Sequence, residues 1–174
     1  WWDYPSTSIV ASSHFALSQL LYEKADEAVA LASSGHAIRL DVPGRDTATC
    51  EDAATRSEVL VDVLRLIDAF LVHHPSNPLA DDAAFSAANA LLDLKAYDRV
   101  VTVSEAGRER FADSDFATSF QYMEALGHFW QRDYDPALEA ARVVAGGESD
   151  DRDFARYILG QIHHAQGLPG DAIR

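Results

Sequence analysis

The fold is decided by residues 111–138, which read FADSDFATSFQYMEALGHFWQRDYDPAL. The stretch opens with a break at 111–114 and continues with side chains at the helical spacing i, i+4, i+7, i+11 and i+14. These are Phe116, Phe120, Met123, Gly127 and Trp130. A second break at 133–135 is followed by Pro136, a residue that suits the first turn of a helix. The stretch therefore predicts a helix over 115–131 and a second helix opening at Asp135-Pro136.

Both breaks of this stretch recur along the chain. The first break has counterparts at 74–77, 37 residues earlier, and more weakly at 147–150, 36 residues later. The second break has counterparts at 96–98, 37 residues earlier, and at 168–170, 35 residues later. Two interleaved landmarks with one shared period predict a repeat protein with two helices in each unit.

The repeat extends the prediction to further helices on either side. We expect them at 79–94, 97–111 and 151–166, with a last one beginning at Asp171. The helix at 79–94 carries start signals. Asn77 is its expected N-cap and Pro78 its first residue, and Asp81 and Asp82 suit the positive end of the helix dipole.

The N-terminal third is less regular. The clearest amphipathic helix of the chain is predicted at 51–74, whose apolar residues share one face. These are Leu60, Val63, Leu64, Ile67, Phe70 and Leu71. Residues 6–33 predict one long helix or two short ones, and 34–50 predict a loop. No stretch alternates with period two, so no strand is predicted.

The last predicted unit carries a family pattern. Its residues Tyr157-Ile158-Leu159-Gly160, Gly167 and Ala172-Ile173 resemble the tetratricopeptide repeat (TPR), which places Leu-Gly in its first helix, Gly at the turn and Ala twelve residues after the first Gly. The earlier units match less closely, since Ala125 and Ala88 stand where Gly is usual. The breaks with Pro-Ser or Asp-Ser are similar to those of the bacterial subfamily found in cell-envelope and assembly factors.

The resemblance implies an all-α fold, a right-handed superhelical array of about six or seven helices in antiparallel pairs (a TPR-like α-solenoid). Its repeats would span 78–113, 114–149 and a partial 150–174, continuous with a diverged helical hairpin at 1–77. Helical repeats bury their apolar faces against their neighbours. A partial last unit leaves the helix at 151–166 half covered, so we expect further repeats or domains of the same parent chain.

Composition excludes several classes of partner. The chain has 28 acidic and 14 basic residues, a net charge of −14, which argues against nucleic acid and anionic membrane surfaces. No apolar run is long enough for membrane insertion. The acidity fits either a high-GC genome or a salt-adapted host. The chain opens at Trp1 like a fragment and shows no targeting signal, so a bacterial cytoplasmic or periplasmic location both stay open.

No pattern indicates catalysis, a cofactor or a metal. Neighbouring residues on a helix point about 100° apart, so the doublets His73-His74 and His163-His164 cannot each place two ligands on one face. We expect them to be exposed or to cap helix ends. Cys50 stands alone, with no indicated His partner, and there is no Gly-x-Ser-x-Gly elbow or phosphate loop. We therefore predict a non-catalytic chain.

The resemblance implies a concave groove lined by the first helices of successive repeats, which would bind a protein or peptide partner. Phe85, Tyr122 and Tyr157 fall at one equivalent position, 37 and 35 residues apart. Such rings are typical binding anchors, but aromatic stripes on helices are also typical of a core between repeats. Both interpretations stay open.

Four further residues complete the candidate groove. Asn89 falls where family members often hold a peptide backbone, and Phe129, Trp130 and His164 fall near that position. The function predicted is a non-catalytic scaffold that takes a helix or an extended segment of a partner. The alternative is a structural or regulatory segment of a larger protein, which could carry an enzymatic domain elsewhere.

Overall fold

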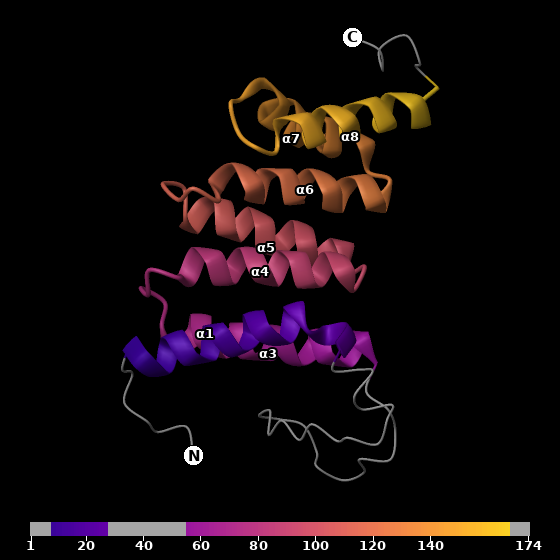
Figure 1. Cartoon of the computed structure of the whole chain (residues 1–174). Coiled ribbons are helices and arrows are strands. Elements are labelled where there is room, and N and C mark those ends of the chain that lie inside the picture. The colour runs from indigo at the N-terminus through magenta and orange to yellow at the C-terminus, as the bar shows by residue number, and fades with distance from the viewer. Residues whose placement is uncertain (1–7, 28–54, 168–174) are drawn as a thin grey trace. The chain divides into compact units, whose positions relative to one another are not determined.

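The computed structural model describes residues 8–27 and 55–167, and within these ranges the chain is helical with no strand (Figure 1). The helices are α1 (Ser8–Glu23), α3 (Arg56–His73), α4 (Ala80–Asp93), α5 (Tyr97–Arg110), α6 (Ala117–Gln131), α7 (Tyr134–Gly146) and α8 (Arg152–Ala165). The all-α prediction is confirmed, and each predicted helix from residue 51 to 166 is present. The loop expected at 34–50 and the helix expected from Asp171 lie outside the described residues.

The chain forms two compact units, residues 1–90 and 91–174, which are described separately. The division falls inside α4, whereas the sequence pattern placed the start of the regular repeats at residue 78. One continuous solenoid over both units stays a prediction. None of the helices in the described ranges combines the length and the hydrophobicity that a membrane crossing requires.

The first unit is built around α3, whose start is fixed by a capping box. Thr55 Oγ1 accepts a hydrogen bond from the Glu58 N–H at 3.3 Å, and the Glu58 carboxylate accepts one from the Thr55 N–H at 2.7 Å. The apolar stripe predicted for this helix is buried except for Leu71, which is half-buried. The helix starts at Arg56 and not at residue 51 as predicted, because Thr55 is extended and caps the first turn.

Helices α1 and α4 complete the first unit. The α1 helix packs on α3, with the rings of Phe15 and Phe70 5.7 Å apart between centroids. The Gln19 side-chain amide donates to the Ser86 hydroxyl at 2.7 Å and joins α1 to α4. Most side chains that α4 buries are alanines, which let neighbouring helices come close. They are Ala80, Ala83, Ala84, Ala87, Ala88 and Ala90.

The start of α4 corrects one sequence expectation. The helix begins at Ala80, not at Pro78. Asn77 Oδ1 accepts from the Leu79 N–H at 2.9 Å, so Asn77 caps a turn that precedes the helix rather than the helix itself. Asp81 and Asp82 occupy the first turn as expected.

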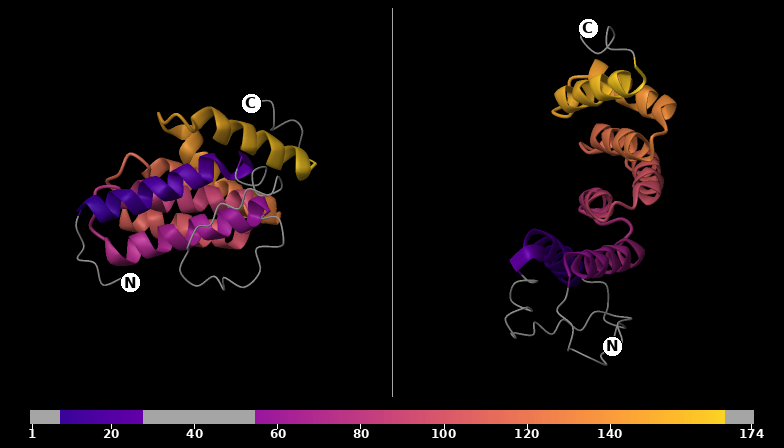
Figure 2. Two further views of the ribbon diagram at one scale, coloured as in Figure 1. Left: turned by 60° about the horizontal axis from the view of Figure 1, so that its bottom comes forward. Right: turned by 90° about the vertical axis from the view of Figure 1, so that its right-hand side faces the viewer.

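The second unit consists of α5 to α8 and the end of α4. Each of these four helices packs against the next along the chain, and α6 also contacts α8 (Figures 1 and 2). The approach of α6 to α5 depends on Gly127. A β-carbon there would lie 2.7 Å from Val101 Cγ2 and 3.1 Å from the Tyr97 carbonyl oxygen. The α6 stripe is buried at Phe120, Met123 and Gly127, whereas Trp130 is 53% exposed.

The core between α6, α7 and α8 is made of small and branched side chains. It contains Ala125, Ala137, Leu138, Ala140, Ala141, Ile158 and Ile162. The α8 helix buries one narrow stripe, Ala155, Ile158 and Ile162. Several side chains on the remainder of α8 are therefore open to solvent, and they belong to the candidate site.

Candidate peptide-binding surface

Helices α6 and α8 contact each other, and the sequence period predicts that they hold equivalent positions in consecutive repeats. Tyr122 on α6 and Tyr157 on α8, which are 35 residues apart, were predicted to occupy the same place in their repeats. The residues around this contact form what is called here the α6/α8 surface. It consists of Ser119, Tyr122, Asp151, Phe154 and Tyr157.

Two aromatic rings of this surface are exposed and one is half-buried. Phe154 and Tyr157 are 62% and 65% exposed on α8, which is unusual for side chains of this size. Tyr122 packs with one side against the α6–α7–α8 core, and its ring lies 6.3 Å from that of Phe154, tilted by 42°. Tyr122 therefore packs against the core and Tyr157 is exposed, and that either ring lines a groove stays a prediction.

Asp151 connects the two helices at this surface. It precedes α8, and its Oδ2 accepts a hydrogen bond from the Ser119 hydroxyl of α6 at 2.6 Å. Its carboxylate does not cap the α8 backbone. The pKa of the Tyr122 phenol is raised, first because burial penalises the phenolate and then because Asp151 adds a negative charge nearby. The Asp151 carboxylate therefore lies near the phenol of Tyr122, whose ring is paired with that of Phe154.

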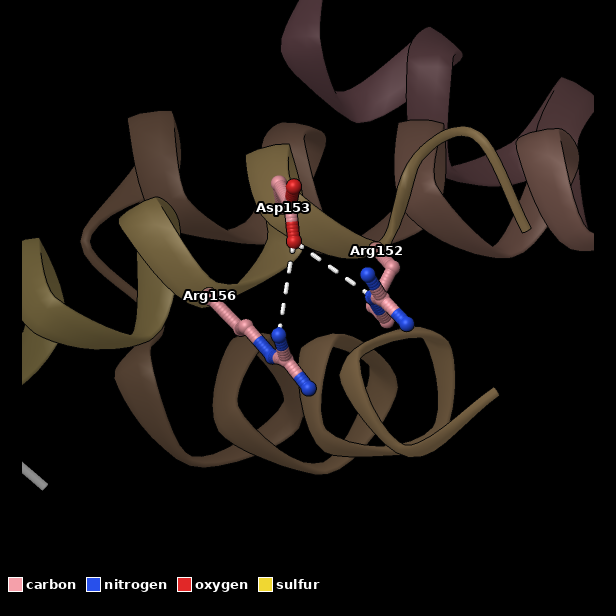
Figure 3. Close-up of polar contacts among 3 residues, drawn as sticks. All are labelled: Arg152, Asp153 and Arg156. Carbon is pink, nitrogen blue, oxygen red and sulfur yellow. Dashed lines mark hydrogen bonds and ion pairs between the residues drawn. The ribbon is translucent and has the colours of Figure 1, made fainter. Parts of the chain in front are cut away.

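The positive charges at the start of α8 are held by a different carboxylate. Asp153 Oδ1 lies 3.4 Å from Arg152 Nε and 3.4 Å from Arg156 Nη1 (Figure 3). All three side chains are substantially exposed, so these ion pairs contribute little to stability. These ion pairs direct both arginines to Asp153.

The predicted residues at the end of α6 form a separate aromatic cluster. The Phe129 ring meets Trp130 edge-on at 5.3 Å and lies 6.4 Å from Tyr134 of α7. Trp130 stacks on Tyr97 of α5 at 5.9 Å. Phe129 also packs against the core. These rings join α5, α6 and α7 and are in large part structural.

His164 lies in the last turn of α8 and is exposed. It borders a shallow, open hollow on this helix. The hollow is lined by Arg156, Tyr157, Gly160, Gln161 and His164. His164 and Tyr157 therefore line the same hollow, and the groove position predicted for His164 stays a prediction.

Phe85 and Asn89 lie on the part of α4 that belongs to the first unit. The Asn89 side-chain amide donates to the Phe85 carbonyl oxygen at 3.2 Å, so it is engaged within its own helix. Of the three rings expected to form a ladder, the second unit contains Tyr122 and Tyr157. A groove that includes Phe85 stays a prediction.

Sequence reasoning missed three members of the α6/α8 surface. Phe154 lies three residues before Tyr157 and one period after Ser119, so the repeat and the helical spacing could have found it. The bond between Ser119 and Asp151 had no sequence signal, because it joins residues 32 apart across a helix pair.

A second group of polar side chains lies between α5 and α6. Ligand atoms of Glu105, Glu124 and His128 lie within 4.8 Å of one another. Arg108 Nε is 3.3 Å from Glu124 Oε2, so a guanidinium already supplies positive charge there. Glu124 and His128 are spaced i, i+4, which places them on one face of a helix. This spacing is visible in the sequence, but only the His doublets were considered as metal ligands. That the chain binds no metal stays a prediction.

No family model matches the chain, and neither the curated proteins nor the solved structures contain a detectable relative. The resemblance to tetratricopeptide repeats therefore depends on the sequence landmarks. The structure adds the helices and their neighbour-to-neighbour packing.

Proposed function

We propose that this chain is a non-catalytic interaction module of the TPR-like type, and that the α6/α8 surface binds a peptide or helix of a partner protein. The observation that carries the proposal is the exposure of Phe154 and Tyr157, at 62% and 65%, beside the half-buried ring of Tyr122. Aromatic side chains bury a large contact area and have few rotatable bonds, so ordering them costs little entropy.

The repeat architecture supports this function. A period of 35 to 37 residues relates the landmarks of successive helix pairs, and α5 to α8 pack in sequence order. We propose that the pairs belong to a right-handed superhelix in which α6 and α8 line the inner side. Such arrays present extended surfaces to which a partner segment can bind along several repeats.

The polar groups of the surface favour binding over catalysis. The Ser119 hydroxyl donates directly to the Asp151 carboxylate. A nucleophilic serine is normally activated by an adjacent base such as His, and a hydrogen bond to a carboxylate alone does not provide that arrangement. Ser119 is thus better suited to positioning Asp151 than to attacking a substrate.

The test is selection of binders from a displayed library of helical and extended peptides, followed by affinity measurement on purified chain. Phe154→Ala and Tyr157→Ala are expected to weaken selected peptides roughly tenfold or more each, as for anchors at an interface. Both side chains are exposed, so their loss should leave the helical circular dichroism and the melting temperature nearly unchanged.

Val143→Ala is the matched control, because Val143 on α7 is a similarly exposed apolar side chain, at 58%. It should leave the affinity unchanged. If no peptide is selected, or if the Phe154 and Tyr157 variants bind as well as the parent chain, the α6/α8 surface is not a binding site. The alternative of a structural spacer within a larger protein would then be favoured.

A further inference from the structure

We infer that the α6/α8 surface selects a cationic side chain, above all arginine, at the place bounded by Tyr122, Phe154 and Asp151. This inference depends on the proposed function and specifies which chemistry the partner segment must carry. Three features carry the inference. The rings of Tyr122 and Phe154 lie side by side, Asp151 has one carboxylate oxygen available, and the neighbouring arginines contact a different carboxylate.

The carboxylate of Asp151 has one oxygen in use. Oδ2 accepts the Ser119 hydroxyl at 2.6 Å, which fixes the orientation of the group. Within residues 8–27 and 55–167, Oδ1 has neither a hydrogen bond nor an ion pair with a side chain. The residue is half-buried, so a partner cation placed on it would interact in surroundings less polar than bulk water.

The nearest arginines in sequence do not neutralise Asp151. Arg152 and Arg156 both contact Oδ1 of Asp153 (Figure 3). The negative charge of Asp151 is the second cause, after burial, of the raised Tyr122 pKa. The neighbourhood therefore keeps a negative charge beside the aromatic pair.

A guanidinium fits these features better than other side chains. It is planar, so it can stack on the exposed face of Phe154 or Tyr122 while its N–H groups point to the carboxylate. It stays charged at all ordinary pH values, and its hydrogen bonds to a carboxylate are among the strongest in proteins. The net charge of −14 adds a long-range attraction for a basic segment.

The probes are short acetylated and amidated peptides in a leucine–alanine background that differ at one central residue: arginine, citrulline or glutamate. Citrulline has nearly the shape of arginine and no charge. Binding is measured by backbone amide chemical-shift changes of isotope-labelled chain at moderate salt. The arginine peptide is expected to shift the amides of Ser119, Tyr122, Asp151 and Phe154 and to bind roughly tenfold more tightly than the citrulline peptide.

Asp151→Asn is the diagnostic variant, because an asparagine keeps the shape and an acceptor oxygen for Ser119. In this variant the arginine and citrulline peptides should bind with about equal affinity. Asp150→Asn removes the same charge one residue away, at an exposed position, and is expected to keep the preference.

The outcomes separate the two proposals. Equal binding of all three peptides at the α6/α8 surface would overturn the inference about arginine and leave the binding function standing. Absence of binding by every probe, together with an empty peptide selection, would overturn both. A preference for arginine that persists in Asp151→Asn would overturn the role of Asp151.

Discussion

The ring of Phe120 occupies the space that a β-carbon on Gly107 would need. A β-carbon built on Gly107 lies 2.5 Å from Phe120 Cε1 and 2.7 Å from Cδ1. Phe120 is fully buried, and its ring also stacks on that of Phe111, with the centroids 6.4 Å apart. The packing of α5 on α6 thus depends on a glycine in the last turn of α5, within a helix, where glycine is otherwise unfavourable.

Gly107→Ala is expected to destabilise the protein despite the better helix propensity of alanine. The propensity gain is about 1 kcal/mol, whereas forcing a methyl group into packed surroundings costs about 1–3 kcal/mol. We predict a net loss of up to about 2 kcal/mol in the free energy of unfolding, measured by urea denaturation.

Gly146→Ala is the control for this prediction, because a β-carbon there meets nothing within 4 Å. It should be neutral or stabilise by up to about 1 kcal/mol. If Gly107→Ala stabilises to the same degree, α5 and α6 can separate without cost and the close contact is not required.

Ser104→Ala is expected to stabilise α5. Ser104 is fully buried, and its hydroxyl has no hydrogen-bond partner in the part of the chain that the structure describes. Removing a buried polar group without a partner relieves a desolvation cost of about 1–3 kcal/mol, and alanine also favours the helix. We expect a gain of about 1 kcal/mol in thermal or urea unfolding.

The comparison for Ser104 is Thr102→Ala on the same helix. The exposed Thr102 hydroxyl donates to the Asp98 carbonyl oxygen at 3.1 Å. This change should stay within about 0.5 kcal/mol of the parent. A clear loss of stability in Ser104→Ala would mean that the buried hydroxyl makes a bond that matters.

Thr55→Ala is predicted to destabilise α3 by about 1 kcal/mol, because it removes the N-cap side of the capping box. Glu58→Gln should cost less than Glu58→Ala, since an amide oxygen can still accept from the Thr55 N–H. Ser57→Ala, an exposed change between the two, serves as the control. Equal stability of the Thr55 and Ser57 variants would contradict a role for the cap.

The raised pKa of Tyr122 predicts a pH dependence at the alkaline end. The folded protein holds the phenol proton more tightly than the unfolded chain does. The contribution to stability is therefore constant below the unfolded pKa of about 10 and is lost as pH rises from there through the higher folded pKa. Tyr122→Phe should show a shallower loss of stability in this range.

Asp151→Asn tests the second cause of the same shift. Removing that charge is expected to lower the Tyr122 pKa part of the way, because burial, the larger cause, remains. Near-ultraviolet absorbance of the phenolate, taken as a difference from Tyr122→Phe, reports the titration. An unchanged titration would show that the Asp151 charge does not reach the phenol.

Local patterns were sufficient to predict the helices. The stripes of α3 and α6, the breaks between helices and the acidic first turn of α4 are all properties of neighbouring residues. One error lies where a local turn competes with a local signal for a helix start. Pro78 suits a helix start, yet the turn capped by Asn77 delays α4 to Ala80. The exposure of Trp130 was decided by tertiary contacts: it continues the α6 stripe, stacks on Tyr97 and is 53% exposed.

The candidate site was predictable only in part. The shared period placed Tyr122 and Tyr157 in equivalent positions, because a repeat transfers a position from one unit to the next. It could not say which ring would be covered. Tyr122 packs against the core between α6, α7 and α8, so that ring is half-buried, whereas Tyr157 is 65% exposed.

The sequence by itself determined an all-helical chain with paired helices, through a shared period of 35 to 37 residues and apolar stripes at helical spacing. The tertiary structure alone decided that the Ser119 hydroxyl meets Asp151 and that the Phe120 ring fills the gap at Gly107. Helical spacing is a local property that each segment carries within itself. Contacts between helices depend on how closely two surfaces approach, which no single segment contains.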